Sequence, residues 1–259
     1  MKQSFHYDFQ IAEAFVEQHQ AVLACVLKFE QEGELFGDGE RNEIRLFDAL
    51  GMKVNVKRFK NPNVVNTWVY RYLRPSKAER SFRYAEKLLA MGLGTPRPIA
   101  YAENKKWNGL KDSYYLSEHL NCDLTYRELV HDPNYPEHEQ ILRAFTRFTF
   151  ELHENGVLFK DHSPGNTLIK KTSDGYNFYL VDLNRMEFKS LTQAERIYNF
   201  SRLTPVKDMV RVMSEEYATL AGYDQHQTFT AMWGHVSHFQ EKYHRKQRLK
   251  KKLLFWRKR

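Results

Sequence analysis

Apolar positions in the first half of the chain change from a helical spacing to a strand-like one. Up to residue 32 they recur every three or four positions, which predicts a helical N-terminal extension. Between residues 33 and 60, glycines separate short apolar runs, a pattern typical of antiparallel strands joined by turns. Ser76-Lys77-Ala78-Glu79 then has the pattern of a capping box, which predicts the start of a helix that ends near Gly92.

The second half of the chain has a different balance of elements. TPRPIAYAE and DSYYLSEHL predict two further strands, and from about Thr125 onward most of the apolar spacing is helical. Strands with one helix, followed mainly by helices, predict an α+β fold with a small β-rich N-terminal lobe and a larger helical C-terminal lobe. The expected divisions are an extension at 1–32, the small lobe at 33–118, the large lobe at 119–241 and a tail at 242–259.

The positive charge of the chain is concentrated at its C-terminal end. The formal net charge is +8 over 259 residues, and residues 242–259 hold ten Lys or Arg and no acid. The rest of the chain has 30 basic and 32 acidic residues, so it is close to neutral. Two interpretations of this tail remain open: a solvated end, or an anchor on an anionic membrane surface that uses Leu253, Leu254, Phe255 and Trp256. A near-neutral body without a recognised motif argues against a nucleic-acid partner.

Other features of the sequence favour the cytoplasm. The N-terminal MKQSFHYDFQ has no apolar segment of the kind that a secretory signal needs, and no run of about twenty apolar residues occurs. Cys25 and Cys122 match no metal or redox motif and are interpreted as reduced core thiols. We therefore expect a cytoplasmic protein, and the basic tail would hold it peripherally on the inner face of the cytoplasmic membrane.

Residues 158–184, which include LFKDHSPGN and LVDLN, bring two carboxylates and an amide into one region. Pro164-Gly165 predicts a turn that returns the side chain of Asn166 toward Asp161. Two apolar runs on either side of KKTSDGYN predict a hairpin that carries Asp182 to the same end. Asn166 and Asp182 would then be oxygen ligands for Mg²⁺, which takes few protein ligands, while the carboxylate of Asp161 would act on a hydroxyl.

This set of side chains fits phosphoryl transfer, which needs positioning, a metal that neutralises charge, and an Asp that accepts the proton of the acceptor. Asp161 and Asn166 have the D-x-x-x-x-N spacing of a kinase catalytic loop. Val54-Asn55-Val56-Lys57 repeats the V-A-I-K pattern of the lysine that binds ATP phosphates, and Glu118 ends the strand that should connect the lobes. Lys57 and Glu118 are the candidate nucleotide-binding residues, with ATP and Mg²⁺ as the expected cofactors.

Several motifs together resemble one family. H-x-x-G-x-x-x-x-D-x-x-x-x-N with a downstream VDLNRM, SKAERSF followed by TPRPIAY, and SPGN are similar to the lipopolysaccharide core kinases, over roughly residues 35–215. The resemblance implies a two-lobed protein-kinase-like fold and an ATP-dependent kinase that phosphorylates a sugar hydroxyl of a lipid-linked glycan, Kdo or heptose. The D…N…D core alone is shared with aminoglycoside and other small-molecule kinases, so it identifies only the superfamily.

Departures from the family pattern keep alternatives open. Kinases of this type place a glutamate on the first long helix, about eleven residues before the glycine that ends it. Here the residue eleven positions before Gly92 is Ser81, so the sequence does not identify the partner of Lys57. The glycine of the kinase DFG pattern is also missing from Asp182-Leu183-Asn184. The alternatives are a catalytically weak or inactive ATP-binding protein, and a kinase that acts on a protein or a small molecule.

Candidate residues can also be named for binding the nucleotide phosphates and for binding the acceptor. Gly37-Asp38-Gly39 is a remnant of a phosphate-binding loop, and Arg41 and Asn42 are expected to do part of its work. An anionic glycan acceptor needs Arg or Lys in the cleft that binds it, and three residues are candidates for that role. They are Arg185, Arg202 and Lys207.

Overall fold

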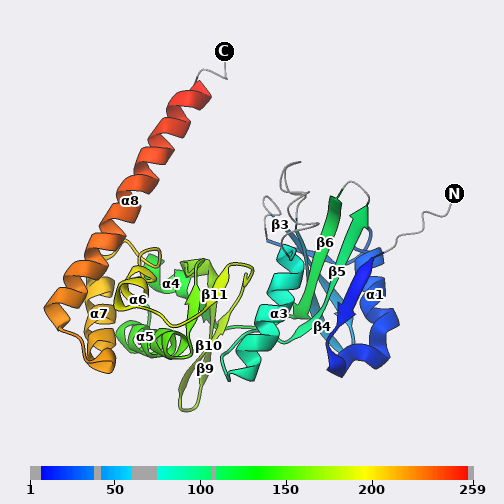
Figure 1. Cartoon of the computed structure of the whole chain (residues 1–259), viewed down its shortest axis with the longest axis horizontal. Coiled ribbons are helices and arrows are strands. Elements are labelled where there is room, and N and C mark those ends of the chain that lie inside the picture. The colour runs from blue at the N-terminus through cyan, green and yellow to red at the C-terminus, as the bar shows by residue number, and fades with distance from the viewer. Residues whose placement is uncertain (1–6, 38–41, 60–74, 107–108, 256–259) are drawn as a thin grey trace. The chain divides into compact units, whose positions relative to one another are not determined.

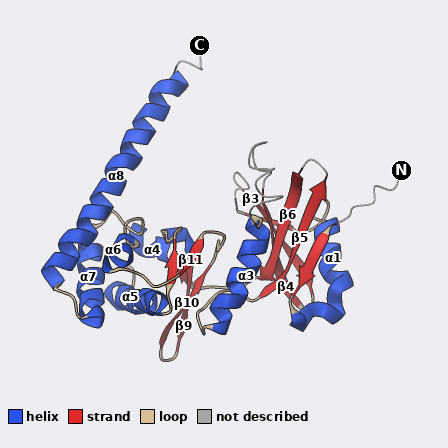
Figure 2. Cartoon of the chain, viewed as in Figure 1, coloured by secondary structure: helices blue, strands red, loops and turns tan. Residues whose placement is uncertain are grey.

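A computed structural model of the chain describes residues 7–37, 42–59, 75–106 and 109–255 (Figure 1). The chain divides into two compact units. The N-terminal unit consists of Met1–Asn121 and Leu180–Arg185, and the C-terminal unit consists of Cys122–Tyr179 and Met186–Arg259. Strands dominate the first unit and helices the second, as Figure 2 shows, in agreement with the predicted β-rich and helical lobes.

The N-terminal unit is built on a six-stranded antiparallel sheet with the strand order β1-β5-β6-β4-β3-β2. Side chains alternate along β4, so Val54 and Val56 are fully buried and form part of the core. The strands are β1 (Asp8–Ile11), β2 (Glu34–Phe36), β3 (Asn42–Ala49), β4 (Met52–Phe59), β5 (Pro98–Lys106) and β6 (Gly109–Glu118).

The start of the chain differs from the predicted helix. Asp8–Ile11 form β1, which pairs with β5, and the partly buried Tyr7, Phe9 and Ile11 pack against the core of the sheet. This every-second-residue contact is the period of a strand. The helical prediction was wrong here because Ile11 fits both periods, and a short apolar run does not distinguish them. Helical structure begins only at η1 (Glu13–Gln18) and α1 (His19–Leu27).

Helix α3 (Lys77–Ala90) packs on the sheet and forms where the capping pattern predicts it. The Ser76 hydroxyl oxygen accepts a hydrogen bond from the backbone N–H of Glu79 at 3.1 Å, which satisfies one of the free donors at the helix start. The Glu79 carboxylate pairs with Arg83 at 2.6 Å. Gly92 has a φ of +75°, a left-handed conformation that ends the helix at little cost for glycine.

The C-terminal unit consists of helices with two small sheets, ordered β10-β9-β7 and β11-β8. Strands β9 and β10 form the predicted hairpin on either side of the polar turn. The helices are α4 (Tyr126–His131), α5 (His138–Glu154), α6 (Gln193–Tyr198), α7 (Lys207–Ala221), α8 (Gln225–Phe255) and the 3₁₀ helix η2 (Pro164–Asn166). The strands are β7 (Leu124–Thr125), β8 (Val157–Phe159), β9 (Thr167–Thr172), β10 (Gly175–Leu180) and β11 (Met186–Phe188).

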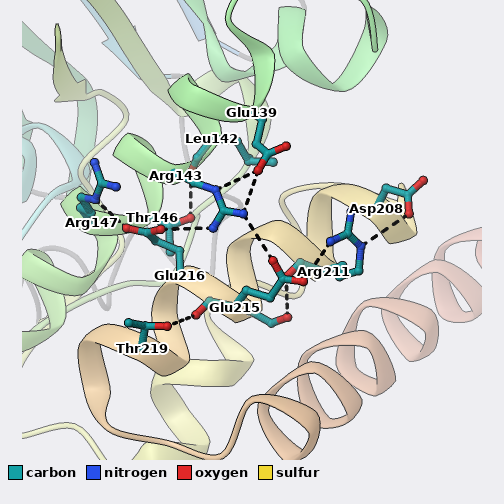
Figure 3. A network of polar contacts seen from close by, with 11 residues as sticks. Glu139, Leu142, Arg143, Thr146, Arg147, Asp208, Arg211, Glu215, Glu216 and Thr219 are labelled. Atoms are coloured by element: carbon teal, nitrogen blue, oxygen red, sulfur yellow. Dashed lines mark hydrogen bonds and ion pairs between the residues drawn. The ribbon is translucent and has the colours of Figure 1, made fainter.

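Helices α5 and α7 are joined by shared ion pairs, which Figure 3 shows. Arg143 of α5 contacts Glu139 on its own helix at 2.8 Å, and it contacts Glu215 and Glu216 of α7 at 3.3 and 3.2 Å. Arg147 adds a contact to Glu216 at 2.6 Å. Single surface pairs contribute at most about 1 kcal/mol each, but a network with shared partners fixes how the two helices lie against each other. Helix α5 is therefore a firm support for the loop that follows it.

Helix α8 has a packed first half and an exposed second half. Thr228, Met232 and Val236 are buried, and the helix contacts α6 and α7. From residue 241 to residue 253 every position is exposed. The helix continues without a break across residue 242, so the described part of the basic segment is an extension of α8; residues 256–259 of that segment lie outside the described residues. None of the described helices combines the length and apolar character that a bilayer span requires.

Candidate active site

Lys57 and Asp182 come together within the N-terminal unit from positions 125 residues apart. The Lys57 Nζ lies 2.6 Å from Asp182 Oδ1, and the Lys57 side chain is 12% exposed. Val54 and Val56 point into the core, so the pleat of β4 turns Lys57 to the other face of the sheet. The same ammonium lies 5.2 Å from the centre of the Phe59 ring, which further limits its positions.

The segment that carries Asp182 is held by backbone contacts to the chain that follows α3. The Leu180 N–H donates to Gly94 O at 2.9 Å, and the Thr95 hydroxyl donates to Leu180 O at 2.8 Å. Asp182 itself has a φ of +60°, a left-handed conformation that costs a residue other than glycine about 1 kcal/mol or more. Strain of this kind is retained where the position of a side chain matters, which marks Asp182 as a functional candidate.

Asn184 takes up the position where kinases of this pattern have glycine, and it contacts the same carboxylate. Its Nδ2 donates to Asp182 Oδ1 at 2.7 Å, and the residue is 7% exposed. Asp182 Oδ1 therefore has two donors, Lys57 and Asn184. The missing glycine is visible in the sequence, but the contact between Asn184 and Asp182 is not. The local turn brings these two side chains together, and no known sequence motif describes that contact.

Helix α3 (Lys77–Ala90) has no carboxylate among its buried residues. Its buried positions include Ala78, Ser81, Phe82 and Ala85. Ser81 donates to the Lys77 carbonyl, so the position where kinases have glutamate is used within the helix. The partner of Lys57, which the sequence could not identify, is Asp182 in this structure.

Asp161 and Asn166 lie on the loop between β8 and β9 of the C-terminal unit. The Asn166 N–H donates to Ser163 O at 3.0 Å, which closes the turn that Pro164-Gly165 predicted. Asn166 Nδ2 donates to the backbone oxygen of Asp161 at 2.8 Å. A carbonyl oxygen only accepts, so this bond fixes the amide nitrogen toward Asp161 and leaves Oδ1 as the oxygen that can bind another group.

Arg202, which the sequence indicated as a contact for an anionic glycan, lies beside the Asp161 carboxylate. Its Nη1 donates to Asp161 Oδ1 at 3.0 Å and to Lys160 O at 3.2 Å. The Asp161 side chain is 17% exposed. Lys207, a second candidate for that role, lies over the rings of Phe229 and Trp233 of α8. No signal in the sequence predicted that Arg202 and Asp161 would pair, because 41 residues separate them.

Two buried histidines, His153 and His162, lie close to the loop between β8 and β9. His153 Nδ1 lies 2.7 Å from the Tyr217 hydroxyl and its Nε2 lies 3.1 Å from Asn199 Oδ1, while Asn199 Nδ2 donates to Phe159 O at 2.8 Å. Burial lowers the pKa of His153 to about 4. His162, next to Asp161, is 1% exposed, and neither of its ring nitrogens has a hydrogen-bond partner among the described residues. Burial lowers the pKa of His162 to about 3, so both rings are neutral near pH 7.

The remaining nucleotide-binding candidates are Glu118 and the residues of the predicted phosphate loop. Glu118 ends β6, where its N–H donates to Arg97 O at 2.9 Å and its carboxylate lies 3.5 Å from Arg97 Nε. Its backbone N–H and its side chain are therefore already engaged. Of the phosphate-loop candidates, residues 38–41 lie outside the described residues, while Gly37 has a φ of +83° that favours glycine.

The candidate metal ligands, Asp182 and Asn166, are too few to hold a metal ion without further ligands, and this fits Mg²⁺. Within the described ranges, no group of three or more His, Cys, Asp or Glu side chains could hold a metal ion. Mg²⁺ commonly binds through one or two protein oxygens and completes its shell with phosphate oxygens and water. Asp182 has a carboxylate in the N-terminal unit, and Asn166 has an amide oxygen in the C-terminal unit; each is a donor of that kind.

Comparisons with known proteins bear on the family and the fold of the chain. A family model described as "Lipopolysaccharide kinase (Kdo/WaaP) family" matches residues 30–223, which is more than half of the chain. The solved structure "WaaP in complex with acyl carrier protein" is similar to this chain with a TM-score of 0.62 at 14% sequence identity, covering 90% of this chain and 97% of that one. No curated protein matches the chain. At this identity the structural likeness shows the fold alone, and it confirms the predicted two-lobed, protein-kinase-like α+β fold.

Proposed function

Since the chain belongs to the lipopolysaccharide kinase (Kdo/WaaP) family and is therefore a kinase, we propose that it transfers the γ-phosphoryl group of ATP to a sugar hydroxyl of the lipopolysaccharide inner core, on Kdo or heptose. The observation that carries this proposal is the contact of Lys57 with Asp182 at 2.6 Å. It joins the lysine of a V-A-I-K-like strand to the aspartate that follows the hairpin, and these are the two residues to which we assign phosphate binding and metal binding.

Lys57, Asp182 and Asn166 bind the nucleotide and its metal in this proposal. Lys57 is a compact cation suited to phosphate oxygens, and Asp182 with Asn166 would hold Mg²⁺ through their side-chain oxygens. When bound, Mg²⁺ neutralises charge on the phosphates and helps to orient them. Glu118 is proposed to contribute through its place at the end of β6, where the nucleotide base would lie.

Asp161 is the proposed catalytic residue. The acceptor hydroxyl oxygen forms a bond to the γ-phosphorus, the bond from that phosphorus to the β–γ bridging oxygen breaks, and ADP leaves with the electron pair. The hydroxyl proton passes to the Asp161 carboxylate. General-base assistance of this kind contributes roughly 10²- to 10⁴-fold to the rate. Arg202 keeps the carboxylate in one orientation, since its Nη1 donates to Oδ1 at 3.0 Å.

An acceptor panel with labelled ATP tests the proposal. The purified chain is incubated with Kdo-lipid A, heptosylated core, casein and kanamycin, and incorporation of label is measured with and without Mg²⁺. We expect Mg²⁺-dependent transfer to one of the two glycolipids and none to casein or kanamycin. Transfer to casein or kanamycin alone would contradict the glycan acceptor, and ATP binding without transfer to any member of the panel would contradict the catalytic role.

We also propose that the exposed half of α8 holds the enzyme at the anionic cytoplasmic surface of a membrane, where a lipid-linked acceptor is found. Residues 241–253 are exposed and carry one acidic residue, Glu241. Near such a surface each Lys or Arg contributes about 1 kcal/mol, and the attraction is screened by salt. The exposed basic residues are Lys242, Arg245, Lys246, Arg248, Lys250, Lys251 and Lys252.

Vesicle sedimentation distinguishes this surface from a protein partner. Deleting residues 242–259 should leave the fold and nucleotide turnover intact, because residues 242–253 are all exposed. The deletion should abolish binding to vesicles that contain anionic lipid, and raised salt should weaken binding of the full chain. Equal vesicle binding by both forms would contradict the membrane role. The acyl carrier protein named in the similar structure would then be the partner to test against the same helix.

A further inference from the structure

The guanidinium of Arg202 uses only one of its ends in the C-terminal unit. Both of its hydrogen bonds run from Nη1, to Asp161 Oδ1 at 3.0 Å and to Lys160 O at 3.2 Å. A guanidinium has five N–H donors in a fixed plane, and its Nε and Nη2 form a second edge with two parallel donors. This second edge faces away from the contacts that Nη1 makes with the catalytic loop.

The second edge includes a donor that the protein leaves without an acceptor. Arg202 Nε is buried, and no described residue accepts a hydrogen bond from it. The ring of Phe239 in α8 lies 5.6 Å from the guanidinium carbon, which holds the plane without using any N–H group. A buried donor without an acceptor is destabilising, and an oxygen bound at that edge would remove the penalty. The side chain as a whole is 37% exposed, so a ligand from solvent can reach the guanidinium, and a bond to Nε requires it to displace the atoms that cover that nitrogen.

We infer that Arg202 determines acceptor specificity by binding an anionic group of the sugar through Nε and Nη2 while Nη1 holds Asp161. The inference rests on the proposed function, since it concerns the acceptor of the same reaction. A carboxylate or a phosphate offers two oxygens that match the two parallel donors, whereas a neutral hydroxyl offers one. With its anionic group on one edge of the guanidinium and Asp161 on the other, an acidic sugar places a hydroxyl beside the catalytic carboxylate.

This arrangement favours an acidic sugar over a neutral one as the acceptor. The carboxylate of a sugar such as Kdo and a phosphate group carried on the glycan would bind Nε and Nη2 in the same way. Separate acceptors, one with each group, are needed to distinguish them. A neutral heptose without a neighbouring phosphate would leave the second edge empty. The test therefore measures how strongly the effect of Arg202 depends on the charge of the acceptor.

The experiment compares kcat/KM of the full chain and of Arg202→Gln on three acceptors. One is a soluble Kdo-containing acceptor, the second is the same acceptor with its carboxylate reduced to an alcohol, and the third is a neutral sugar acceptor that carries a phosphate. Charged hydrogen bonds of this type change affinity by about ten- to a hundredfold. We expect Arg202→Gln to lower kcat/KM on an anionic acceptor at least tenfold more than on the reduced one, mainly through KM.

Two further variants separate recognition from folding. Arg147→Gln removes an arginine of the α5–α7 network that does not contact Asp161 in the described structure, and it should change none of the three activities by more than about twofold. Arg202→Lys keeps the charge but cannot reach Asp161 and a bidentate anion together, so it should restore only part of the selectivity. A larger loss on the Kdo-containing acceptor identifies the carboxylate, and a larger loss on the phosphorylated one identifies the phosphate.

Equal losses on all three acceptors would overturn the inference and leave Arg202 as a residue that only orients Asp161. In that outcome wild-type transfer to the glycan still supports the proposed function. If the wild-type chain transfers phosphate to none of the acceptors, the proposed function fails and the inference fails with it.

Discussion

The two units hold their charged groups in opposite ways. In the N-terminal unit Lys57 and Asn184 both donate to one oxygen of Asp182, at 2.6 and 2.7 Å, and the lysine side chain is only 12% exposed. In the C-terminal unit Asp161 contacts one end of Arg202, and the other edge of that guanidinium is unused by the described residues. Both groups contain an ion pair, but only the arginine of the second group retains N–H donors that a ligand can use.

This difference predicts that the two proposed substrates, ATP with Mg²⁺ and the acceptor, bind in different ways. If Lys57 and Asp182 have the proposed roles, Mg²⁺ and the phosphates of ATP must compete with the contact between these two side chains, so nucleotide binding requires a local exchange of partners. The acceptor meets a carboxylate whose orientation is already fixed by Arg202. Changes in the N-terminal group should therefore alter the dependence on ATP and Mg²⁺, and changes in the C-terminal group should alter transfer to the acceptor.

Asp161→Asn should have the largest effect and should leave the nucleotide side unchanged. The amide cannot accept the acceptor proton as the carboxylate does, so kcat should fall by roughly 10²- to 10⁴-fold. The Kd for ATP should stay within a few-fold, measured by calorimetric titration. Asp208→Asn, at an aspartate whose side chain is 90% exposed, is the matched control. Retention of more than half of the turnover would contradict the assignment of Asp161.

Asp182→Asn should weaken activity in a way that depends on magnesium. Loss of one carboxylate charge lowers metal affinity, so at low Mg²⁺ the rate should fall by about ten- to a hundredfold and recover in part at high Mg²⁺. Asn166→Ala should show a milder form of the same dependence, because it removes a neutral oxygen. If the rates of both variants are insensitive to Mg²⁺ concentration, these residues do not hold the metal.

Lys57→Met should raise the KM for ATP by about tenfold or more, since a charged contact to phosphate is lost while the apolar stem of the side chain is kept. The comparison variant is Lys53→Met on the same strand, where the lysine is 49% exposed and its Nζ lies 3.7 Å from Asp48. Steady-state kinetics with varied ATP should show a change only in the Lys57 variant. Equal KM values for the two variants would place the phosphate contact elsewhere.

His162→Phe should have the smallest effect on activity and a measurable effect on acid stability. The ring lies among Phe145, Phe159 and Phe200, and neither nitrogen is hydrogen-bonded among the described residues, so a phenyl ring suits the site. At pH 7.5 the thermal midpoint should be unchanged or higher, with turnover within a few-fold of the wild type.

The pH dependence of that variant follows from the lowered pKa of His162. A histidine whose pKa falls from about 6.5 when unfolded to about 3 when folded stabilises the fold fully above pH 6.5. That stabilisation is lost as the pH falls from 6.5 toward 3, because the unfolded chain takes up the proton first. Thermal melts between pH 7.5 and 4 should therefore decline less steeply for His162→Phe than for the wild type. Identical slopes would show that the ring is not buried as a neutral group.

The sequence predicted those features that depend on local spacing. The turn at Pro164-Gly165, the D-x-x-x-x-N pair and the lysine of β4 all follow from patterns within a few residues. The strand at Asp8–Ile11 was missed because its apolar residues fit two periods and only its pairing with β5 decides between them. The contacts of Arg202 with Asp161 and of Lys57 with Asp182 join residues 41 and 125 positions apart, and no spacing rule covers such distances.

The short segment Leu180–Arg185 determines how this chain can be cut or recombined. It belongs to the N-terminal unit, although the residues on both sides of it belong to the C-terminal unit. A fragment that stops at Asn121 would contain Lys57 but neither Asp182 nor Asn184, and its lysine would lose the carboxylate it contacts. Exchange of N-terminal lobes between family members at that boundary would therefore pair each lysine with a foreign aspartate segment. A recombinant that keeps the original pair must therefore carry Leu180–Arg185 together with the N-terminal lobe.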